Sequence, residues 1–265
     1  MNESKPVSHS YDLQLIPARL FTVNKNYQRN AKRKEITDII NNFDYHLVNP
    51  VKAVKRDGVY YVWDGQQTLI ALYTKFGPEY LIPTFVYYDI DDSKQEARLL
   101  VDGNTNTGAG TKLTPNEVWD AILWADDPTA LRINEIANAH GFNLGSGKKR
   151  KEQSIQAVDA VQKMYKILTE KQFEALFRII RGAWDGDPDS VTKPIIRGMA
   201  KFIKVYDGKF DEKNLIRRLS KKSPKEIIRN GRASFSKGDT KWAREIFEIY
   251  NNGTSTNRLP DLFGE

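Results

Sequence analysis

The chain has 265 residues, 40% of them hydrophobic and 28% charged, a composition typical of a globular protein and not of a disordered one. It has no cysteine, which excludes disulfides and thiolate metal sites, and its three histidines lie at no metal-ligand spacing, so we expect no metal centre. No apolar run approaches the roughly 20 residues that span a bilayer, so we expect a cytoplasmic protein with no membrane partner.

The positive charge is unevenly spread along the chain, whose net charge is +7. Residues 1–112 hold 14 basic and 13 acidic residues, whereas residues 113–265 hold 27 basic and 21 acidic residues. The excess therefore lies in the C-terminal part, where an acidic polyelectrolyte such as DNA is the natural partner. A lysine-rich face that contacts only solvent is the alternative.

Strand and helix patterns alternate in the first half of the chain. Apolar patterning predicts strands at 13–17, 49–54, 58–63 and 82–88. A turn at 56–58 joins the second strand to the third. Four apolar residues at helical spacing predict a helix between the first two strands: Ile36, Ile39, Ile40 and Phe43. The segment from Asp102 to Thr111 is rich in Gly, Asn and Thr, and we expect a loop there.

From residue 113 onward the pattern is helical. Thr114 as N-cap, Pro115 at the first helical position and Glu117 at the third predict a capping box. Further helices are expected near 129–140, 152–168, 170–181, 190–206, 211–219, 224–230 and 239–251. We therefore predict an α+β protein, with a small mixed-sheet domain at 1–112 and an all-helical basic domain at 113–265.

The most informative segment joins the strand that ends at Trp63 to the next helix. Its residues are Asp64, Gly65, Gln66, Gln67 and Thr68. The first amides of a helix have no acceptor within the helix and lie at the positive end of its dipole, so they favour an anion. Gly65 permits a tight turn, and the three residues after it add uncharged hydrogen-bonding groups. We predict a phosphate site here. The alternative is an ordinary turn in which Asp64 caps the helix.

This segment resembles the Asp-Gly-Gln-His/Gln-Arg signature of the ParB/sulfiredoxin superfamily. The resemblance covers the N-terminal half, and it includes Tyr27-Gln28-Arg29, which is similar to the Gln-Arg before the first helix of ParB-like nuclease domains. The compact arrangement also resembles proteins carried by phages and mobile elements. The resemblance implies a ParB/sulfiredoxin-like fold and a nucleoside triphosphate, bound with Mg²⁺, as the cofactor. It also implies that Arg29 and Asn104 complete the phosphate site formed by Gly65, Gln66, Gln67 and Thr68.

Two departures from the family pattern bear on the chemistry. Thr68 stands where the family usually has an arginine that faces nucleotide phosphates, so binding is favoured over hydrolysis. The chain also lacks the cysteine of sulfiredoxins, which excludes their redox chemistry because its nucleophile is absent.

Basic residues gather at two places in the C-terminal part. Residues 148–151 follow Gly145-Ser146-Gly147 and suit a basic loop that contacts phosphates. Between Lys213 and Lys237, nine basic residues accompany a single acid, Glu226. The residues that we expect to contact DNA are Lys148, Lys149, Arg150, Lys151, Arg217, Arg218, Lys221, Lys222, Lys225 and Arg229. Phe235 and Trp242 would stack on bases, or pack in the core instead.

The segment from Ile133 to Gly141 resembles the first helix and turn of a helix-turn-helix, a unit that ParB proteins place after the nucleotide domain. Gly145-Ser146-Gly147 interrupts the place where a recognition helix would start. A plain helical pair is therefore favoured over a helix-turn-helix that reads DNA sequence.

Three functions are compatible with these patterns. The first is a ParB-like DNA-binding protein with a phosphate- or nucleotide-binding loop that gates DNA binding. The second is a nuclease or NTPase that acts on nucleic acid, with Asp64 as metal ligand or base. The third is a degenerate fold retained as an interaction module or as an inhibitor of a nucleic-acid enzyme. The expected partners are DNA and either a second copy of the chain or a phage or host protein.

Overall fold

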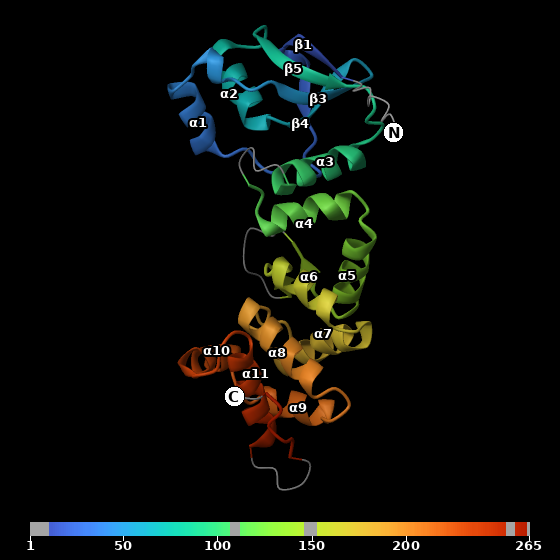
Figure 1. The fold of residues 1–265 in the computed structure, drawn as a ribbon, viewed down its shortest axis with the longest axis vertical. Coiled ribbons are helices and arrows are strands. Elements are labelled where there is room, and N and C mark those ends of the chain that lie inside the picture. Colours follow the sequence, from blue (N-terminus) through green and yellow to red (C-terminus); the bar gives the residue numbers. More distant parts are fainter. Residues whose placement is uncertain (1–10, 107–111, 146–152, 253–257, 264–265) are drawn as a thin grey trace, which may run out of the picture. The chain divides into compact units, whose positions relative to one another are not determined.

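The computed structural model describes residues 11–106, 112–145, 153–252 and 258–263 (Figure 1). The chain separates into two compact units, Met1–Asp127 and Pro128–Glu265. The first contains a mixed sheet and the second is largely helical, which confirms the predicted α+β class. The assignment of a nucleotide function to residues 1–112 and a DNA function to residues 113–265 remains a prediction. No helix in the described ranges is long and apolar enough to cross a membrane.

A five-stranded sheet forms the centre of the first unit. Its strands are β1 (Tyr11–Pro17), β2 (Phe21–Val23), β3 (Val51–Arg56), β4 (Val59–Asp64) and β5 (Leu81–Tyr87). They lie in the order β1-β5-β3-β4-β2. The pairs β1–β5 and β3–β4 are antiparallel, whereas β3–β5 and β2–β4 are parallel. The register of β3 against β4 shifts between Lys52 and Ala53, and this irregularity places Lys52 opposite Asp64.

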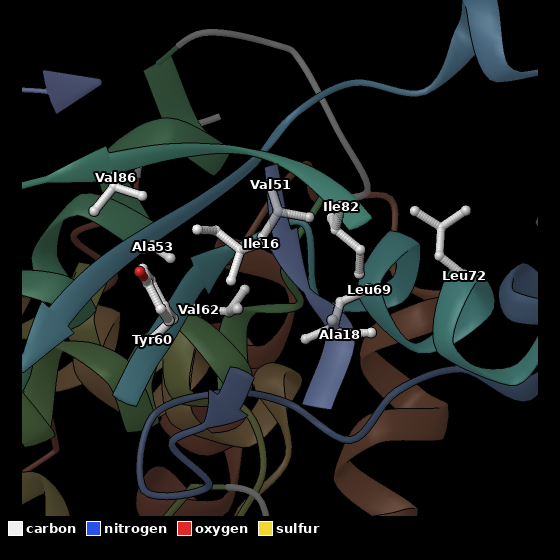
Figure 2. Packing of buried hydrophobic residues seen from close by; sticks show 10 residues of the cluster. All are labelled: Ile16, Ala18, Val51, Ala53, Tyr60, Val62, Leu69, Leu72, Ile82 and Val86. Atoms are coloured by element: carbon white, nitrogen blue, oxygen red, sulfur yellow. The ribbon is translucent and has the colours of Figure 1, made fainter. Parts of the chain in front are cut away.

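One face of this sheet carries the main core of the first unit. Side chains alternate between the two faces of a strand, so every second residue points to the core. Leu69 and Leu72 of α2 (Gln66–Phe76) pack onto this face (Figure 2). The cluster consists of Ile16, Ala18, Val51, Ala53, Tyr60, Val62, Leu69, Leu72, Ile82 and Val86. Burial of each large aliphatic side chain contributes about 1.5–3 kcal/mol, so the position of α2 on the sheet is strongly fixed.

Three further helices complete the first unit: α1 (Arg33–Asn41), α3 (Ser93–Asn106) and α4 (Pro115–Trp124). The helix α1 packs on α2, and α3 packs between α4 and β4. A second cluster, made of Tyr27, Ala97, Leu100, Ala121 and Ala125, joins α3 to α4. The capping box before α4 is confirmed: the amide of Glu117 donates to Thr114 Oγ1 at 3.3 Å, and the amide of Thr114 donates to Glu117 Oε2 at 2.7 Å.

The expectation of a loop from Asp102 onward is wrong for its first part, because α3 continues to Asn106. Glycine and asparagine are weak helix formers, and that composition favoured a loop. Ala97 and Leu100, one turn earlier, pack against α4, and this packing outweighs local propensity. The rest of the expected loop, residues 107–111, lies outside the described residues.

Helices α5 to α11 form most of the second unit: α5 (Pro128–Ala139), α6 (Val158–Ile167), α7 (Glu170–Trp184), α8 (Lys193–Val205), α9 (Glu212–Leu219), α10 (Pro224–Ala233) and α11 (Thr240–Asn251). Two short strands, β6 (Asn143–Leu144) and β7 (Ser154–Ile155), pair in parallel. They explain one difference from expectation. The chain enters β6 after α5, and α6 begins at Val158, later than the predicted residue 152, because β7 precedes it.

Trp242 of α11 fills the space between α8 and α10. A Cβ atom placed on Gly198 of α8 would lie 2.6 Å from the Cβ of Trp242, and Gly231 of α10 contacts the indole ring. Glycine is required at these two helix positions because the neighbouring helix passes too close for any side chain. This packing fixes the place of α10 within the second unit.

Candidate functional site

A cavity of about 650 Å³ lies in the first unit, where β4 leads into α2. Its wall is formed by the segment before α1, by α1 itself, by the start of β3, by the turn between β4 and α2, and by α3. The structure brings together on this wall every residue predicted to bind phosphate: Arg29, Gly65, Gln66, Gln67, Thr68 and Asn104. Asp64 lies among them. The roles of these residues remain predictions.

Gly65 makes the turn into α2. Its φ is +92°, in the left-handed region, and a Cβ atom there would lie 3.2 Å from the Cα of Val51. Only glycine fits both conditions. Gly65 is itself the N-cap and supplies no side-chain hydrogen bond, so the alternative in which Asp64 caps the helix is wrong. The first intrahelical bond runs from the amide of Leu69 to the carbonyl of Gly65. The amides of Gln66, Gln67 and Thr68 are left without a capping side chain.

Two glutamine side chains at the start of α2 carry buried polar atoms without partners. Gln66 is only 6% exposed, and in the described part of the chain its Nε2 has no hydrogen-bond acceptor. Gln67 donates from Nε2 to Glu35 Oε2, while its buried Oε1 has no donor among the described residues. A carboxylate only accepts, so Glu35 fixes the orientation of the Gln67 amide. Unpaired buried donors and acceptors are costly in an empty protein, and they indicate a place where a ligand supplies the missing partners.

Gln28 holds the segment before α1 against the end of β4. Its Nε2 donates to the carbonyl of Trp63 at 2.8 Å and to that of Val62 at 3.2 Å. This brace places the adjacent Arg29 on the cavity wall, where its guanidinium lies 4.0 Å from Glu117 and donates to the carbonyl of Lys112 at 3.4 Å. The sequence motif contained Gln28, but its clamp on β4 is visible only in the fold.

A buried network fixes the same segment from the other side. The hydroxyl of Tyr27 donates to Glu96 Oε2 at 2.5 Å, and Arg56 forms an ion pair with the same carboxylate. Glu96 is fully buried, and such a charge is tolerated because it is paired and hydrogen-bonded. Burial, and then the bond to Glu96, raise the pKa of Tyr27 well above its ordinary value. Tyr27 therefore stays a protonated donor throughout the physiological range.

The charges on the cavity wall nearly cancel. Two cations, Arg29 and Lys52, share the wall with three acids, Glu35, Asp38 and Asp64. Lys52 Nζ lies 3.0 Å from Asp64 Oδ2, and Lys32 pairs with Glu35 at the same distance. Within the described ranges no three acidic or histidine side chains are grouped closely enough to hold a metal ion. The role of Asp64 as a metal ligand or a base therefore stays a prediction.

Several wall residues were not predicted from the sequence. Glu35 and Asp38 come from α1, which reaches the loop only because it packs on α2. The position of Lys52 could have been predicted from the sequence. A two-residue turn joins β3 to β4, and counting back from this turn places Lys52 within one residue of Asp64 in the paired register. Asn104 was predicted, and its Nδ2 donates to the carbonyl of Leu100 at 2.7 Å, so one of its two N–H groups is used within α3.

The predicted DNA contacts divide into three groups. Lys148, Lys149, Arg150 and Lys151 lie outside the described residues. Other side chains already have partners in the second unit: Arg217 and Arg218 bond to Asn214, Lys222 pairs with Glu226 at 2.6 Å, and Lys225 pairs with Asp189 at 3.2 Å. The last group, Lys221 and Arg229, is exposed and makes no ion pair with any described residue.

The structure adds Arg232 to this surface. Lys225, Arg229 and Arg232 recur at spacings of four and three along α10, so they project from one exposed face. They border a groove of about 860 Å³ beside the segment before α8. Of the two aromatic candidates, Phe235 is fully exposed just after α10, whereas Trp242 packs between helices.

Comparisons with known proteins give a family and a distant structural likeness. No curated protein matches the chain. Among solved structures, the C-terminally truncated chromosome-partitioning protein ParB from Caulobacter crescentus, complexed with CTP-gamma-S, is similar at 12% identity. The match covers 63% of this chain and 92% of that chain, with a TM-score of 0.25, so no residue role follows from it. A family model described as a family of unknown function (DUF6551) matches residues 23–263. The chain therefore belongs to the DUF6551 family.

Proposed function

We propose that the first unit binds a nucleotide through phosphate, in the cavity at the start of α2, and that the second unit binds DNA. The observation that carries the first half is the set of unpaired groups around that cavity. The amides of Gln66, Gln67 and Thr68 have no capping side chain, and the buried Nε2 of Gln66 has no acceptor in the described chain. The volume of about 650 Å³ is within the range of small-molecule pockets.

The DNA half of the proposal is supported by α10. Lys225, Arg229 and Arg232 form an exposed row; Lys225 pairs with Asp189, whereas Arg229 and Arg232 make no ion pair with a described residue, so a phosphate backbone would offset their charge. Phe235, fully exposed beside this row, offers an aromatic face on which a base can stack. Most contacts of this kind go to the backbone and carry no sequence information, so we expect binding with little sequence preference.

Calorimetry tests the nucleotide half. CTP, ATP and GTP, with and without Mg²⁺, and their mono- and diphosphates are titrated into the wild type and into Gln66→Met. Methionine keeps the length of the side chain and removes the buried donor. We expect binding in the wild type and none in the variant.

The same variant separates a binding role from a structural one. A buried donor without a partner costs about 1–3 kcal/mol, so the empty Gln66→Met protein should be as stable as the wild type or more so. Gln162→Met, on α6 of the second unit, serves as the control and should keep nucleotide binding. Equal binding by Gln66→Met and the wild type, or no binding of any nucleotide, would overturn this half of the proposal.

Gel shifts with duplex DNA at rising salt test the second half. Contacts between basic side chains and phosphates release counterions, so the affinity should fall steeply as salt increases. Repeating the titration with saturating nucleotide tests gating: the DNA affinity should change, and DNA should change the nucleotide affinity by the same factor. An affinity for DNA that does not depend on salt would contradict backbone contacts.

A further inference from the structure

We propose that the ligand of this cavity carries a single phosphate group, so that it is a nucleoside monophosphate or the equivalent unit of a nucleic acid strand, and not a nucleoside triphosphate. This inference rests on the proposed nucleotide function and narrows it. Two features of the cavity carry it: the small amount of uncompensated positive charge on its wall, and the combination of one unpaired donor with one unpaired acceptor.

The positive charge available to an anion is small. The start of α2 contributes the equivalent of about half a positive charge, and Arg29 adds a guanidinium that lies 4.0 Å from its nearest acid. Lys52 is already paired with Asp64 at 3.0 Å. A phosphate monoester carries about −1.5 to −2 at neutral pH. The helix start and Arg29 together therefore match one phosphate group.

Further phosphates would meet acids. Glu35 and Asp38 are on the same wall, and Asp38 forms no ion pair with a described residue. Thr68 lies beside the helix start and is uncharged. Like charges on one wall repel, so further phosphates would be bound less tightly there.

The unpaired atoms of Gln66 and Gln67 indicate which chemical groups the ligand carries besides its phosphate. Gln66 Nε2 needs an acceptor, which a phosphate oxygen provides. Gln67 Oε1 needs a donor, and its orientation is fixed because the other end of the amide donates to Glu35. A doubly ionised phosphate monoester has no donor. A nucleoside hydroxyl or amine does, so the two parts of one nucleotide together satisfy both atoms.

Calorimetry on the wild type separates the possibilities. The probes are inorganic phosphate, the four nucleoside monophosphates, the four triphosphates with and without Mg²⁺, and a trinucleotide. At least one monophosphate should bind about tenfold or more tightly than its triphosphate and than inorganic phosphate. Tighter binding of the trinucleotide than of any monophosphate would identify a nucleic acid strand as the source, and weaker binding a free mononucleotide.

The failure of this inference differs from the failure of the proposed function. If a triphosphate, with or without Mg²⁺, binds as tightly as its monophosphate, the single-phosphate inference is overturned while nucleotide binding stands. If no phosphate compound binds, both are overturned.

Two variants test the charge argument directly. Thr68→Arg adds a cation to the wall, and we expect triphosphate affinity to rise about tenfold relative to monophosphate affinity. Thr74→Arg adds the same charge to α2 away from the cavity and should leave the ratio unchanged. Asp38→Asn, at an exposed position of α1, should shift the ratio in the same direction as Thr68→Arg. An unchanged ratio in both cavity variants would overturn the inference.

Discussion

Single residues set the geometry of the cavity, and Gly65 is the most constrained of them. Its left-handed backbone and its 3.2 Å approach to Val51 leave no place for a side chain. The consequence is an α2 that starts without a capping side chain, with its first residues on the cavity wall. Gly58, in the hairpin turn between β3 and β4, also has a positive φ, of +78°, but nothing lies within 4 Å of its missing Cβ.

The comparison of these two glycines yields the first prediction. Gly65→Ala should destabilise the protein by about 1–3 kcal/mol more than Gly58→Ala, because both alanines are strained by the positive φ and only the first meets Val51. Nucleotide affinity should fall in Gly65→Ala and remain in Gly58→Ala. Urea unfolding and calorimetry measure the two effects. Equal losses of stability and unchanged binding would show that the contact with Val51 has no consequence.

The hydroxyl of Tyr27 yields the second prediction. Tyr27→Phe should lower the free energy of unfolding by about 1–3 kcal/mol at neutral pH, because buried Glu96 loses a donor.

This loss should depend on pH in a defined direction. The pKa of Tyr27 is raised in the folded protein, so the folded state keeps a proton that the unfolded chain releases above its ordinary pKa of about 10. The stabilisation is complete below that pH and is lost as the pH rises towards the folded-state pKa. The stability difference between wild type and Tyr27→Phe should therefore narrow above about pH 10. A difference that stays constant from pH 7 to about pH 11 would contradict this account.

At the scale of elements, the close packing of α8 against α11 in the second unit depends on Gly198. Gly198→Ala should cost about 1–3 kcal/mol, because the new Cβ would lie 2.6 Å from the Cβ of Trp242 and 3.1 Å from its carbonyl carbon. Gly182→Ala in α7 is the comparison within the same unit. Its Cβ would meet the Ile216 side chain, with Cδ1 at 3.0 Å and Cγ2 at 3.2 Å, a milder overlap than at Gly198, and the variant gains helix propensity. Thermal unfolding should rank Gly198→Ala well below Gly182→Ala, and the reverse order would refute the packing argument.

The elements that the sequence predicted are those whose signal is local. Alternation marked β1, β3, β4 and β5, and a threonine with a glutamate three residues later marked the start of α4. β2 was missed because three residues carry too little pattern, and the end of α3 was missed because its packing on α4 outweighs its composition. For the same reason the motif identified Gly65 to Thr68 as a possible site, whereas Glu35 reaches the cavity only through tertiary packing.

At the scale of the whole molecule, the excess positive charge of the C-terminal part includes a row of basic side chains on α10. Replacing Lys225, Arg229 and Arg232 together by glutamine should weaken DNA binding and reduce the slope of log affinity against log salt by about 2 to 3. Lys163, Lys166 and Lys201 are exposed on α6 and α8 and provide a control with the same change of charge. Their replacement by glutamine should leave the slope close to that of the wild type. Equal slopes for the two triple variants would mean that α10 makes no special contact.

The central claim is that the ligand binds at the start of α2, and amide hydrogen exchange with and without a saturating nucleotide tests it most directly. The amides of Gln66, Gln67 and Thr68 have no capping side chain in the empty protein, so they should exchange rapidly and become protected when phosphate accepts from them. Protection should also appear from Tyr27 to Arg29, and not in β1. Tight binding without protection of the first turn of α2 would contradict the claim.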